Sequence, residues 1–298
     1  MEILLTGATG FVGSHVLEAL LDQGHKVSII TRGSSDLYRV RTRLHEVEQV
    51  YNMDHDDLES IFQTKHFETI IHTATSYGRN QLLSEQLEAN IQYPIRLLEL
   101  GSKYQATAFI NTDTFFAKEQ HRSYTYLDSY SKSKKFMDGM AKAYAASHPI
   151  KYVNMRLEHV YGPKDQKNKF ISATIRALLQ EASLQLTPGE QKRDFVYVKD
   201  VAKAYTTVLD HLDTLSDTTE FEIGRGFSTS IREFVELAHR LTVSSTTLDF
   251  GSLSYREGEI MDSYANHKEL LALGWKADTD LFAGISAIIE SLIEEPKY

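Results

Sequence analysis

A glycine-rich turn near the N-terminus constrains the fold of this chain more than any other sequence feature. The run Thr6-Gly7-Ala8-Thr9-Gly10-Phe11-Val12-Gly13 follows an apolar stretch at residues 3–6 and precedes an amphipathic pattern at residues 12–23. Glycine permits a tight strand-to-helix turn and lets a pyrophosphate approach the backbone, while the helix N-terminus offers free N–H groups to that anion. In this context the spacing predicts dinucleotide binding. The expected contacts come from Gly7, Thr9, Gly10, Phe11, Val12 and Gly13.

Strand and helix patterns alternate through the first half of the chain. Apolar runs predict strands at residues 26–31, 69–73, 106–111 and 151–157, and longer patterns predict helices at 82–104 and 130–148. This order predicts an α/β fold of the Rossmann type, with a doubly wound parallel sheet covered on both faces.

The pattern becomes irregular beyond Gly162. Helices are expected near residues 170–181, 201–212, 231–241 and 280–293. We expect residues 1–160 to form an NADP-binding domain to which residues 193–224 return. Residues 161–192 and 225–298 are expected to form a smaller substrate-binding domain.

The composition argues against several functional classes. The chain has 298 residues, with 32 Lys+Arg against 41 Asp+Glu and a net charge of −9, which argues against a dedicated nucleic-acid-binding protein. It contains no cysteine, which excludes disulfides and zinc–thiolate sites, and we expect no metal. No apolar run approaches the ~18 residues of a membrane span, and a strand predicted from residue 3 leaves no room for a signal peptide. We therefore expect a cytoplasmic protein that does not bind membranes.

The end of the second predicted strand indicates which dinucleotide binds. A carboxylate there would bind the ribose hydroxyls of NAD, but the chain reads Thr31-Arg32-Gly33-Ser34-Ser35. Because a guanidinium suits a 2′-phosphate, Arg32 favours NADP(H) over NAD(H). The alternative is that Arg32 is a solvated loop residue. Nearby Arg39, Arg41 and Arg43 are interpreted as a solvated face.

Tyr130 and Lys134 form a candidate proton-transfer pair. Residues four apart share one face of a helix, and a neighbouring ammonium lowers the pKa of a phenol from its usual value of about 10. A tyrosine in that setting can serve as an acid or base near neutral pH. Tyr264 and Lys268 repeat the spacing, but Tyr130 opens a helix after the fourth predicted strand and is therefore the better candidate.

These motifs resemble those of the short-chain dehydrogenase/reductase superfamily. Within it they are similar to the extended branch that acts on nucleotide sugars, which is the NAD-dependent epimerase/dehydratase family. The resemblance includes residues 155–163, 193–202 and 256–259 and runs almost end to end. It implies that Tyr130, Lys134 and Thr112 are catalytic, with the Thr112 hydroxyl bonded to the substrate oxygen. Further cofactor contacts that it implies are Thr31, Arg32, Asn52, Met53, Thr73, Ala74, Thr75, Asn90, Tyr130 and Lys134.

The same resemblance implies a nucleotide-sugar substrate. The expected substrate-binding residues are Ser76, Tyr77, Thr112, His159, Arg193 and Arg256. The two arginines match positions that grip a diphosphate, whereas His159 stands where many relatives have asparagine. Relatives also dimerise through helices corresponding to residues 82–104 and 130–148, so a homodimer is expected.

Enzymes of this branch catalyse reduction, epimerisation or dehydration of nucleotide sugars. Dehydratases of the branch usually carry Thr-Asp-Glu after the fourth strand, whereas this chain has Thr112-Asp113-Thr114, which argues against dehydration. Residues 72–80 and 157–163 are similar to those of CDP-abequose and CDP-paratose synthases, which reduce a CDP-linked 4-keto-dideoxy sugar. That implies an NADPH-dependent oxidoreductase acting at C4, in deoxysugar and O-antigen polysaccharide biosynthesis. An NAD-dependent nucleotide-sugar 4-epimerase and a non-catalytic NADP-binding protein remain open alternatives.

Overall fold

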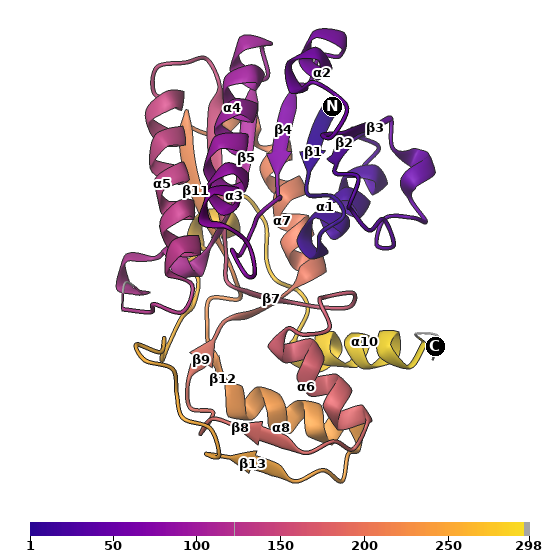
Figure 1. Cartoon of the computed structure of the whole chain (residues 1–298), viewed down its shortest axis with the longest axis vertical. Helices are drawn as coiled ribbons and strands as arrows, with labels where there is room; N and C mark the ends of the chain where they lie inside the picture. Colours follow the sequence, from indigo (N-terminus) through magenta and orange to yellow (C-terminus); the bar gives the residue numbers. More distant parts are fainter. Residues whose placement is uncertain (122, 295–298) are drawn as a thin grey trace.

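A parallel seven-stranded sheet forms the centre of the protein, in the order β11-β6-β5-β4-β1-β2-β3 (Figure 1). The structure is a computed structural model that describes residues 1–121 and 123–294. The strands are β1 (Glu2–Thr6), β2 (Lys26–Thr31), β3 (Gln49–Asn52), β4 (Thr69–His72), β5 (Ala108–Thr114), β6 (Lys151–Leu157) and β11 (Thr218–Ile223).

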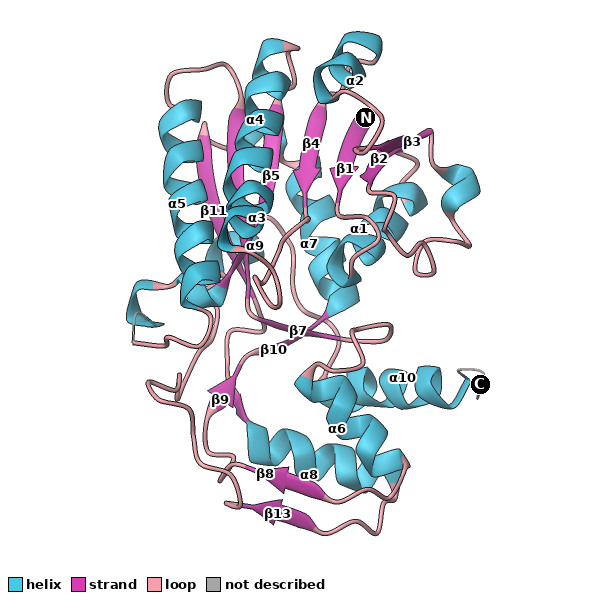
Figure 2. Cartoon of the chain, in the orientation of Figure 1, coloured by secondary structure: helices cyan, strands magenta, loops and turns pink. Residues whose placement is uncertain are grey.

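Helices cover both faces of this sheet (Figure 2). One face packs against α1 (Phe11–Asp22) and α7 (Val198–Asp210), and the other against α2 (Leu58–Thr64), α4 (Tyr93–Lys103) and α5 (Asp128–Ala145). Successive strand residues point to opposite faces, so Leu5 joins the α1 side and Leu4 the α5 side. The predicted Rossmann-type fold is confirmed.

The long helix expected at residues 82–104 is instead broken into three parts. It consists of α3 (Leu83–Leu87), a π-helical turn (Glu88–Gln92) and α4. Pro94 has no N–H to donate to the carbonyl of Asn90, so the regular hydrogen-bond ladder cannot pass this point. The wider turn holds Asn90 in the interior, with 1% of its surface exposed. Such π turns are frequent at functional sites.

Several elements carry no clear sequence signal and were not predicted. The edge strand β3 is half-exposed, β11 alternates polar with apolar residues, and both α2 and α9 (Lys268–Ala272) are short. Short 3-10 turns lie at Leu44–Glu46, Phe115–Ala117, Glu119–His121 and Leu212–Thr214.

A second group of elements lies beyond the carboxyl ends of the main strands (Figure 1). Its three strand pairs are β7 (His159–Tyr161) with β10 (Phe195–Tyr197), β9 (Lys192–Arg193) with β12 (Thr229–Ser230), and β8 (Leu184–Leu186) with β13 (Leu248–Phe250). Its helices are α6 (Phe170–Leu179), α8 (Ile231–Thr242) and α10 (Leu281–Glu294). They surround a separate apolar cluster that includes Phe195, Phe234 and Ile285. Between these elements, α7 and β11 return the chain to the main sheet.

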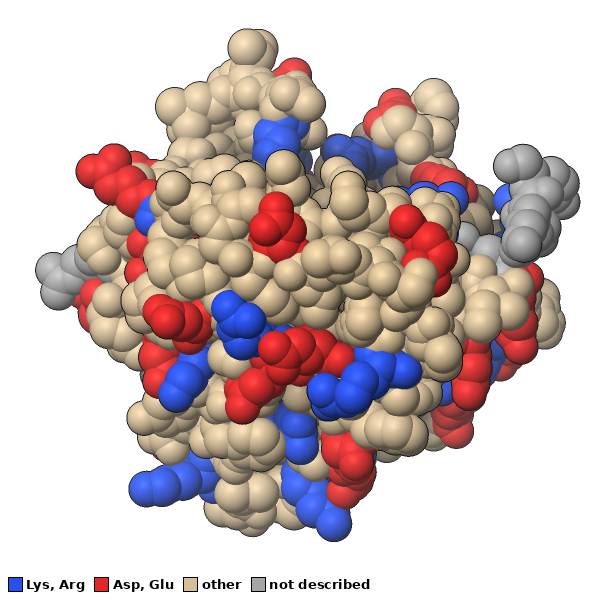
Figure 3. Space-filling view, turned by 90° about the horizontal axis from the view of Figure 1, so that it is seen from below, with Lys and Arg blue, Asp and Glu red and all other residues tan. Residues whose placement is uncertain are grey.

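Surface charges of both signs are interspersed on the face seen from below in Figure 3. Among the described residues, no helix combines the length and apolar character that crossing a bilayer requires.

Candidate active site

The glycine turn forms a cradle between β1 and α1. Gly7 has a φ of +77°, and a Cβ there would overlap the amide nitrogen of Ala74 just beyond β4. A Cβ on Gly13 would overlap the Gly7 carbonyl oxygen and the Thr73 hydroxyl. The Thr73 hydroxyl in turn donates to the Thr6 carbonyl (2.8 Å). Gly10 caps α1 without any side-chain acceptor, so no capping side chain occupies the positive end of the helix, which suits an anion.

The loop after β2 presents Arg32 to solvent beside the edge of the sheet. The Thr31 hydroxyl donates to the Tyr51 carbonyl (3.1 Å), and the Met53 amide donates to the Thr31 carbonyl (2.9 Å), so these strand ends are tied together. The structure also brings Asp54 here, with its Oδ2 accepting from the Gly33 amide (2.7 Å). The sequence of β2 gave no sign of this carboxylate.

Asn52 shapes the same turn. Its side-chain oxygen accepts from the Asp54 backbone amide (3.0 Å), and the backbone amide of Asn52 donates to the Asp56 carboxylate (2.6 Å). These bonds fix the position of Asn52, which was predicted to contact the cofactor.

Tyr130 and Lys134 lie together in the interior, 4% and 3% exposed. The Lys134 ammonium donates to the Thr112 carbonyl (2.7 Å). Burial lowers the pKa of Lys134 to about 8, although the Asp113 carboxylate opposes that shift. Burial also raises the pKa of Tyr130 well above its usual value, with Tyr77 and Asp113 adding to the effect and hydrogen bonds to Thr114 and Thr75 opposing it. The phenol therefore holds its proton at neutral pH.

The second copy of the motif differs. Lys268 opens α9, whereas Tyr264 precedes that helix and is 54% exposed. The two side chains therefore do not share a helical face.

Thr112 was predicted to bond the substrate oxygen with its hydroxyl. In the structure that hydroxyl bonds to the hydroxyl of Tyr205 on α7 (2.7 Å). Thr112 points to the α7 face of β5, on the side of Ala108 and Ile110. Thr114 ends the strand, and its hydroxyl forms a hydrogen bond with Tyr130. Thr114 was not among the predicted site residues, although its place as the last residue of the strand is visible in the sequence.

Asn90 ties the segment after β4 to the helix that carries Tyr130. Its side-chain oxygen accepts from the Ser76 amide (2.8 Å) and the Thr75 hydroxyl (3.2 Å). Its nitrogen donates to the Ser76 carbonyl (2.7 Å) and the Ser133 hydroxyl (3.0 Å). Ser133 bonds the Tyr130 carbonyl (2.8 Å). Asn90 therefore fixes the distance between the two segments.

Tyr77 lies against Tyr130, with ring centroids 4.7 Å apart. The ammonium of Lys169, the residue before α6, lies 3.2 Å from the Tyr77 hydroxyl and 4.5 Å from its ring centroid. Lys169 belongs to no motif and could not have been found from sequence. A hollow of about 350 Å³ opens beside these rings, lined by Tyr77, Gly78, Arg79, Asn80, Tyr126, Leu127 and Ser129.

The three remaining residues that were predicted to bind substrate differ in how freely their side chains could contact a ligand. Burial lowers the pKa of His159 to about 3, so its ring is neutral, and it packs edge-on to Phe195 at 5.3 Å. Arg193 is 7% exposed and already donates to Glu259 (2.7 Å). Arg256 is exposed and donates to the Tyr124 hydroxyl (3.0 Å). Of the two arginines, Arg256 is the one that can meet a ligand without breaking an ion pair.

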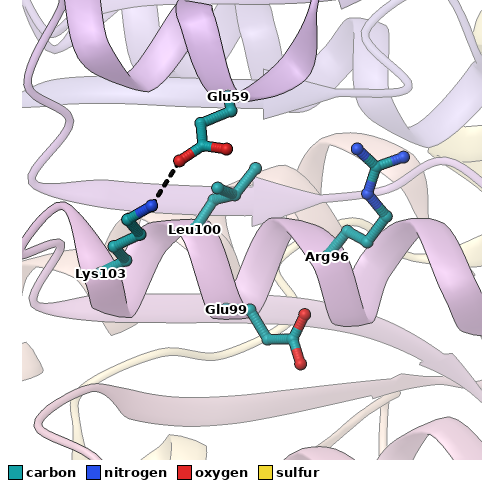
Figure 4. A pocket seen from close by; sticks show the side chains of 5 residues that line it. All are labelled: Glu59, Arg96, Glu99, Leu100 and Lys103. Atoms are coloured by element: carbon teal, nitrogen blue, oxygen red, sulfur yellow. Dashed lines mark hydrogen bonds and ion pairs between the residues drawn. The ribbon is translucent and has the colours of Figure 1, made fainter.

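A second hollow, of about 260 Å³, lies on the outer face of α4 (Figure 4). Its lining residues are Glu59, Arg96, Glu99, Leu100 and Lys103, and Lys103 pairs with Glu59. None of the predicted site residues lies there.

The chain is similar to known proteins both in sequence and in fold. Residues 3–224 match the model of the NAD dependent epimerase/dehydratase family. The chain is 37% identical to CDP-abequose synthase of Salmonella typhimurium, over 97% of this chain and 98% of that one. It is 26% identical to UDP-glucose 4-epimerase of Dictyostelium discoideum, over 93% of this chain and 91% of that one.

A solved structure has the same fold. It is the Bacillus cereus UDP-glucuronic acid 4-epimerase in complex with UDP-glucuronic acid and NAD, with a TM-score of 0.84 and 21% identity. The superposition covers 99% of each chain.

Proposed function

Because the chain belongs to the NAD dependent epimerase/dehydratase family, we propose that it is an NADPH-dependent oxidoreductase that reduces the C4 keto group of a nucleotide-linked 4-keto-deoxy sugar. The buried Tyr130–Lys134 pair beside the glycine cradle carries this proposal. The identity with CDP-abequose synthase supports a CDP-linked substrate and a place in deoxysugar polysaccharide biosynthesis.

A nicotinamide dinucleotide fits the residues present. The cradle at Gly7 and Gly13 leaves no room for a Cβ, and the uncapped end of α1 suits its pyrophosphate. Thr9, Phe11 and Val12 would line the pyrophosphate, Asn52 and Met53 the adenine, and Thr73, Ala74, Thr75 and Asn90 the nicotinamide side. When bound, the cofactor would supply the hydride for C4.

The proton for the new hydroxyl comes from Tyr130. The phenol is protonated before the reaction and donates to the C4 oxygen as negative charge develops there. The Lys134 ammonium stabilises the phenolate that results. The Thr112 carbonyl, which accepts a hydrogen bond from this ammonium, fixes the position of Lys134. We assign to Thr114, rather than Thr112, the hydroxyl that orients the C4 oxygen, because Thr114 bonds the phenol.

The substrate would bind between the two groups of elements. We propose that residues 161–192 and 225–298 form the substrate domain. In this arrangement Arg256 would contact the diphosphate, and Ser76 and Tyr77 would lie beside the sugar. His159 would line the substrate site with an uncharged ring. Arg193 would contribute once it exchanges Glu259 for phosphate.

The chain would act as a homodimer in the cytoplasm. Exposed apolar side chains lie on two adjacent helices, Leu83 and Leu87 on α3 and Phe136 and Met140 on α5. Apolar patches of this kind mark interaction surfaces. A two-fold dimer would cover them on both copies.

An NAD-dependent 4-epimerase is the second candidate, supported by the similarity to UDP-glucose 4-epimerase. The two functions differ in cofactor balance. An epimerase regenerates its cofactor in each turnover, whereas a reductase consumes NADPH in proportion to product.

A panel of CDP-, dTDP-, GDP- and UDP-linked 4-keto sugars with NADPH tests the proposal. We expect sustained NADPH consumption with one class, best with CDP, and a C4 alcohol by NMR. Isomerisation of a 4-hydroxy sugar without net NADPH consumption would favour the epimerase instead.

A further inference from the structure

Lys118 and Glu158 form an ion pair in the interior of the protein. The Lys118 ammonium donates to the Glu158 carboxylate (2.6 Å), and the two side chains are 4% and 0% exposed. Lys118 follows the 3-10 turn at the end of β5, and Glu158 joins β6 to β7. Because taking two charges out of water is costly, such a pair is stable only where further hydrogen bonds satisfy it.

Those hydrogen bonds come from a segment in the C-terminal part of the chain. The Ser263 hydroxyl donates to the carboxylate of the pair (2.8 Å), and the ammonium of the pair also donates to the Tyr264 carbonyl (2.9 Å). The Glu222 carboxylate on β11 accepts both from this ammonium (2.9 Å) and from the backbone amide of Asn266 (2.7 Å). The ion pair therefore ties residues 263–266 to the carboxyl ends of β5, β6 and β11.

The same segment begins at Arg256, the proposed diphosphate contact. Gly258 has a φ of +65°, and a Cβ there would overlap the Ser123 carbonyl oxygen, so the two backbones are in direct contact. Ile260 packs in a small apolar cluster that includes Tyr124. The Arg256 guanidinium donates to the hydroxyl of that tyrosine (3.0 Å). The segment therefore lies along the loop after β5, and the ion pair anchors its far end.

Arg256 lies at the rim of the hollow beside Tyr77. Its guanidinium carbon is 3.7 Å from the centroid of the Tyr126 ring, which lines that hollow. Ordering an arginine side chain costs conformational entropy, and a mobile backbone beneath it would add to that cost. Because Ser263 lies seven residues after Arg256, an anchor there limits the positions that Arg256 can take.

We propose that Lys118 and Glu158 are positioning residues for Arg256. Their buried ion pair holds residues 263–266, so that the Arg256 guanidinium is already in place when the diphosphate of the nucleotide sugar arrives. A guanidinium ordered in advance binds phosphate more tightly, because less freedom is lost on binding. Lys118 and Glu158 would not themselves touch the substrate. This inference rests on the proposed function, in which Arg256 binds the diphosphate.

Calorimetry with CDP and with NADPH, beside steady-state kinetics, tests the inference on the full chain. The double variant Lys118→Met/Glu158→Gln removes both charges together, so neither is left buried alone. Assays at pH 8 keep the wild-type carboxylate ionised, since burial raises the pKa of Glu158 to about 7. We expect the CDP dissociation constant and the KM for the sugar to rise about five- to fiftyfold. The kcat and the NADPH affinity should stay within about twofold of the wild type.

A second substitution separates positioning from general weakening. Arg256→Gln alone should weaken CDP binding, and adding it to the double variant should weaken that binding little further, because the pair acts through Arg256. Lys203→Met is the matched control. It breaks an exposed pair with Asp278 (2.7 Å) that also joins distant segments, and it should change none of these values.

Ser263→Ala tests the same anchor without touching either charge. It removes the hydroxyl that bonds the buried carboxylate and leaves the ion pair intact. The CDP dissociation constant should rise about two- to tenfold, the usual effect of losing one hydrogen bond. This variant decides the question if the double variant does not fold.

The outcomes separate the positioning role from the proposed function. Unchanged CDP binding in Ser263→Ala and in the folded double variant overturns the positioning role alone. So does an equal loss of CDP and NADPH affinity, which would mean that the ion pair only supports the fold. A wild-type chain that binds CDP but reduces no keto sugar contradicts the proposed function, while the CDP titrations still decide the positioning role. A wild-type chain that binds neither CDP nor UDP contradicts the proposed diphosphate site, and the inference fails with it.

Discussion

The ring of Tyr77 covers that of Tyr130 at a centroid distance of 4.7 Å, while Lys169 binds the Tyr77 hydroxyl from the other group of elements. Tyr77 thus connects α5 to the elements that lie beyond the carboxyl ends of the main strands. Burial raises the pKa of Tyr130 well above its usual value, and the neighbouring Tyr77 adds to this effect. The proton needed for reduction is therefore retained in the resting protein.

Replacing Tyr130 with phenylalanine removes the proposed proton donor and little else. Turnover should fall by about 10²–10⁴-fold, the range for loss of a general acid, while NADPH affinity by calorimetry stays close to that of the wild type. Tyr264→Phe is the matched control and should keep full activity, since Tyr264 is exposed and precedes its helix. Full activity in Tyr130→Phe would show that another group donates the proton.

Replacement by valine should affect kcat differently at Thr114 and at Thr112. Thr114→Val removes the hydroxyl bonded to the phenol, and kcat should fall about ten- to a hundredfold. Thr112→Val removes only the bond to Tyr205, so it should lower the melting temperature slightly and change kcat little. Steady-state kinetics on both variants decides the matter, and the reverse ranking would restore the role predicted from the sequence.

Burial of Lys134 makes the stability of the ligand-free chain depend on pH. Its folded-state pKa is about 8, below the ordinary 10.5, so between these values the unfolded chain binds a proton that the folded chain does not. The free energy of unfolding should therefore rise as pH increases from about 8 to about 10.5. Lys134→Met should remove this dependence and stabilise the apoprotein at pH 7 by about 1–3 kcal/mol.

Denaturant titrations at pH 7 and pH 10 measure this effect. Lys132→Met serves as the control, because Lys132 is exposed and pairs with Asp128 one helical turn away. A Lys134→Met protein that is less stable than the wild type at pH 7 would contradict the pKa shift.

The apolar surface of α3 and α5 should be a subunit interface. Phe136→Glu places a charge at its centre, where Phe136 is 56% exposed. Sedimentation velocity should then show a monomer where the wild type is a dimer. Phe282→Glu on α10, at a site 59% exposed, should leave the dimer intact. A wild-type chain that sediments as a monomer would contradict the proposed interface.

Sequence patterns predicted most of the Rossmann half because its signals are local. The glycine turn, the apolar strands and the Tyr130–Lys134 spacing each lie within a few residues of one another. The break at the π turn was missed although Pro94 lies in the middle of the helix predicted at residues 82–104, where a proline interrupts the helical hydrogen bonds.

The site was harder to predict where it depends on strand facing or on distant segments. Thr112 and Thr114 both carry a hydroxyl on β5. Which of the two hydroxyls bonds to Tyr130 depends on the path of the chain at the end of the strand. Lys169 reaches Tyr77 from a loop whose sequence carries no motif. Similarly, Arg193 matched a phosphate-binding position, but the partner that occupies it, Glu259, is 66 residues away.

Reduction at C4 moves one hydrogen from the cofactor to the sugar, and isotope labelling follows that hydrogen. The chain would be incubated with CDP-4-keto-3,6-dideoxyglucose and NADPH carrying two deuterons at nicotinamide C4, and the sugar examined by NMR. We expect one deuterium on C4 of the product for each NADP formed. A recovered sugar without deuterium, beside unchanged cofactor, would contradict it.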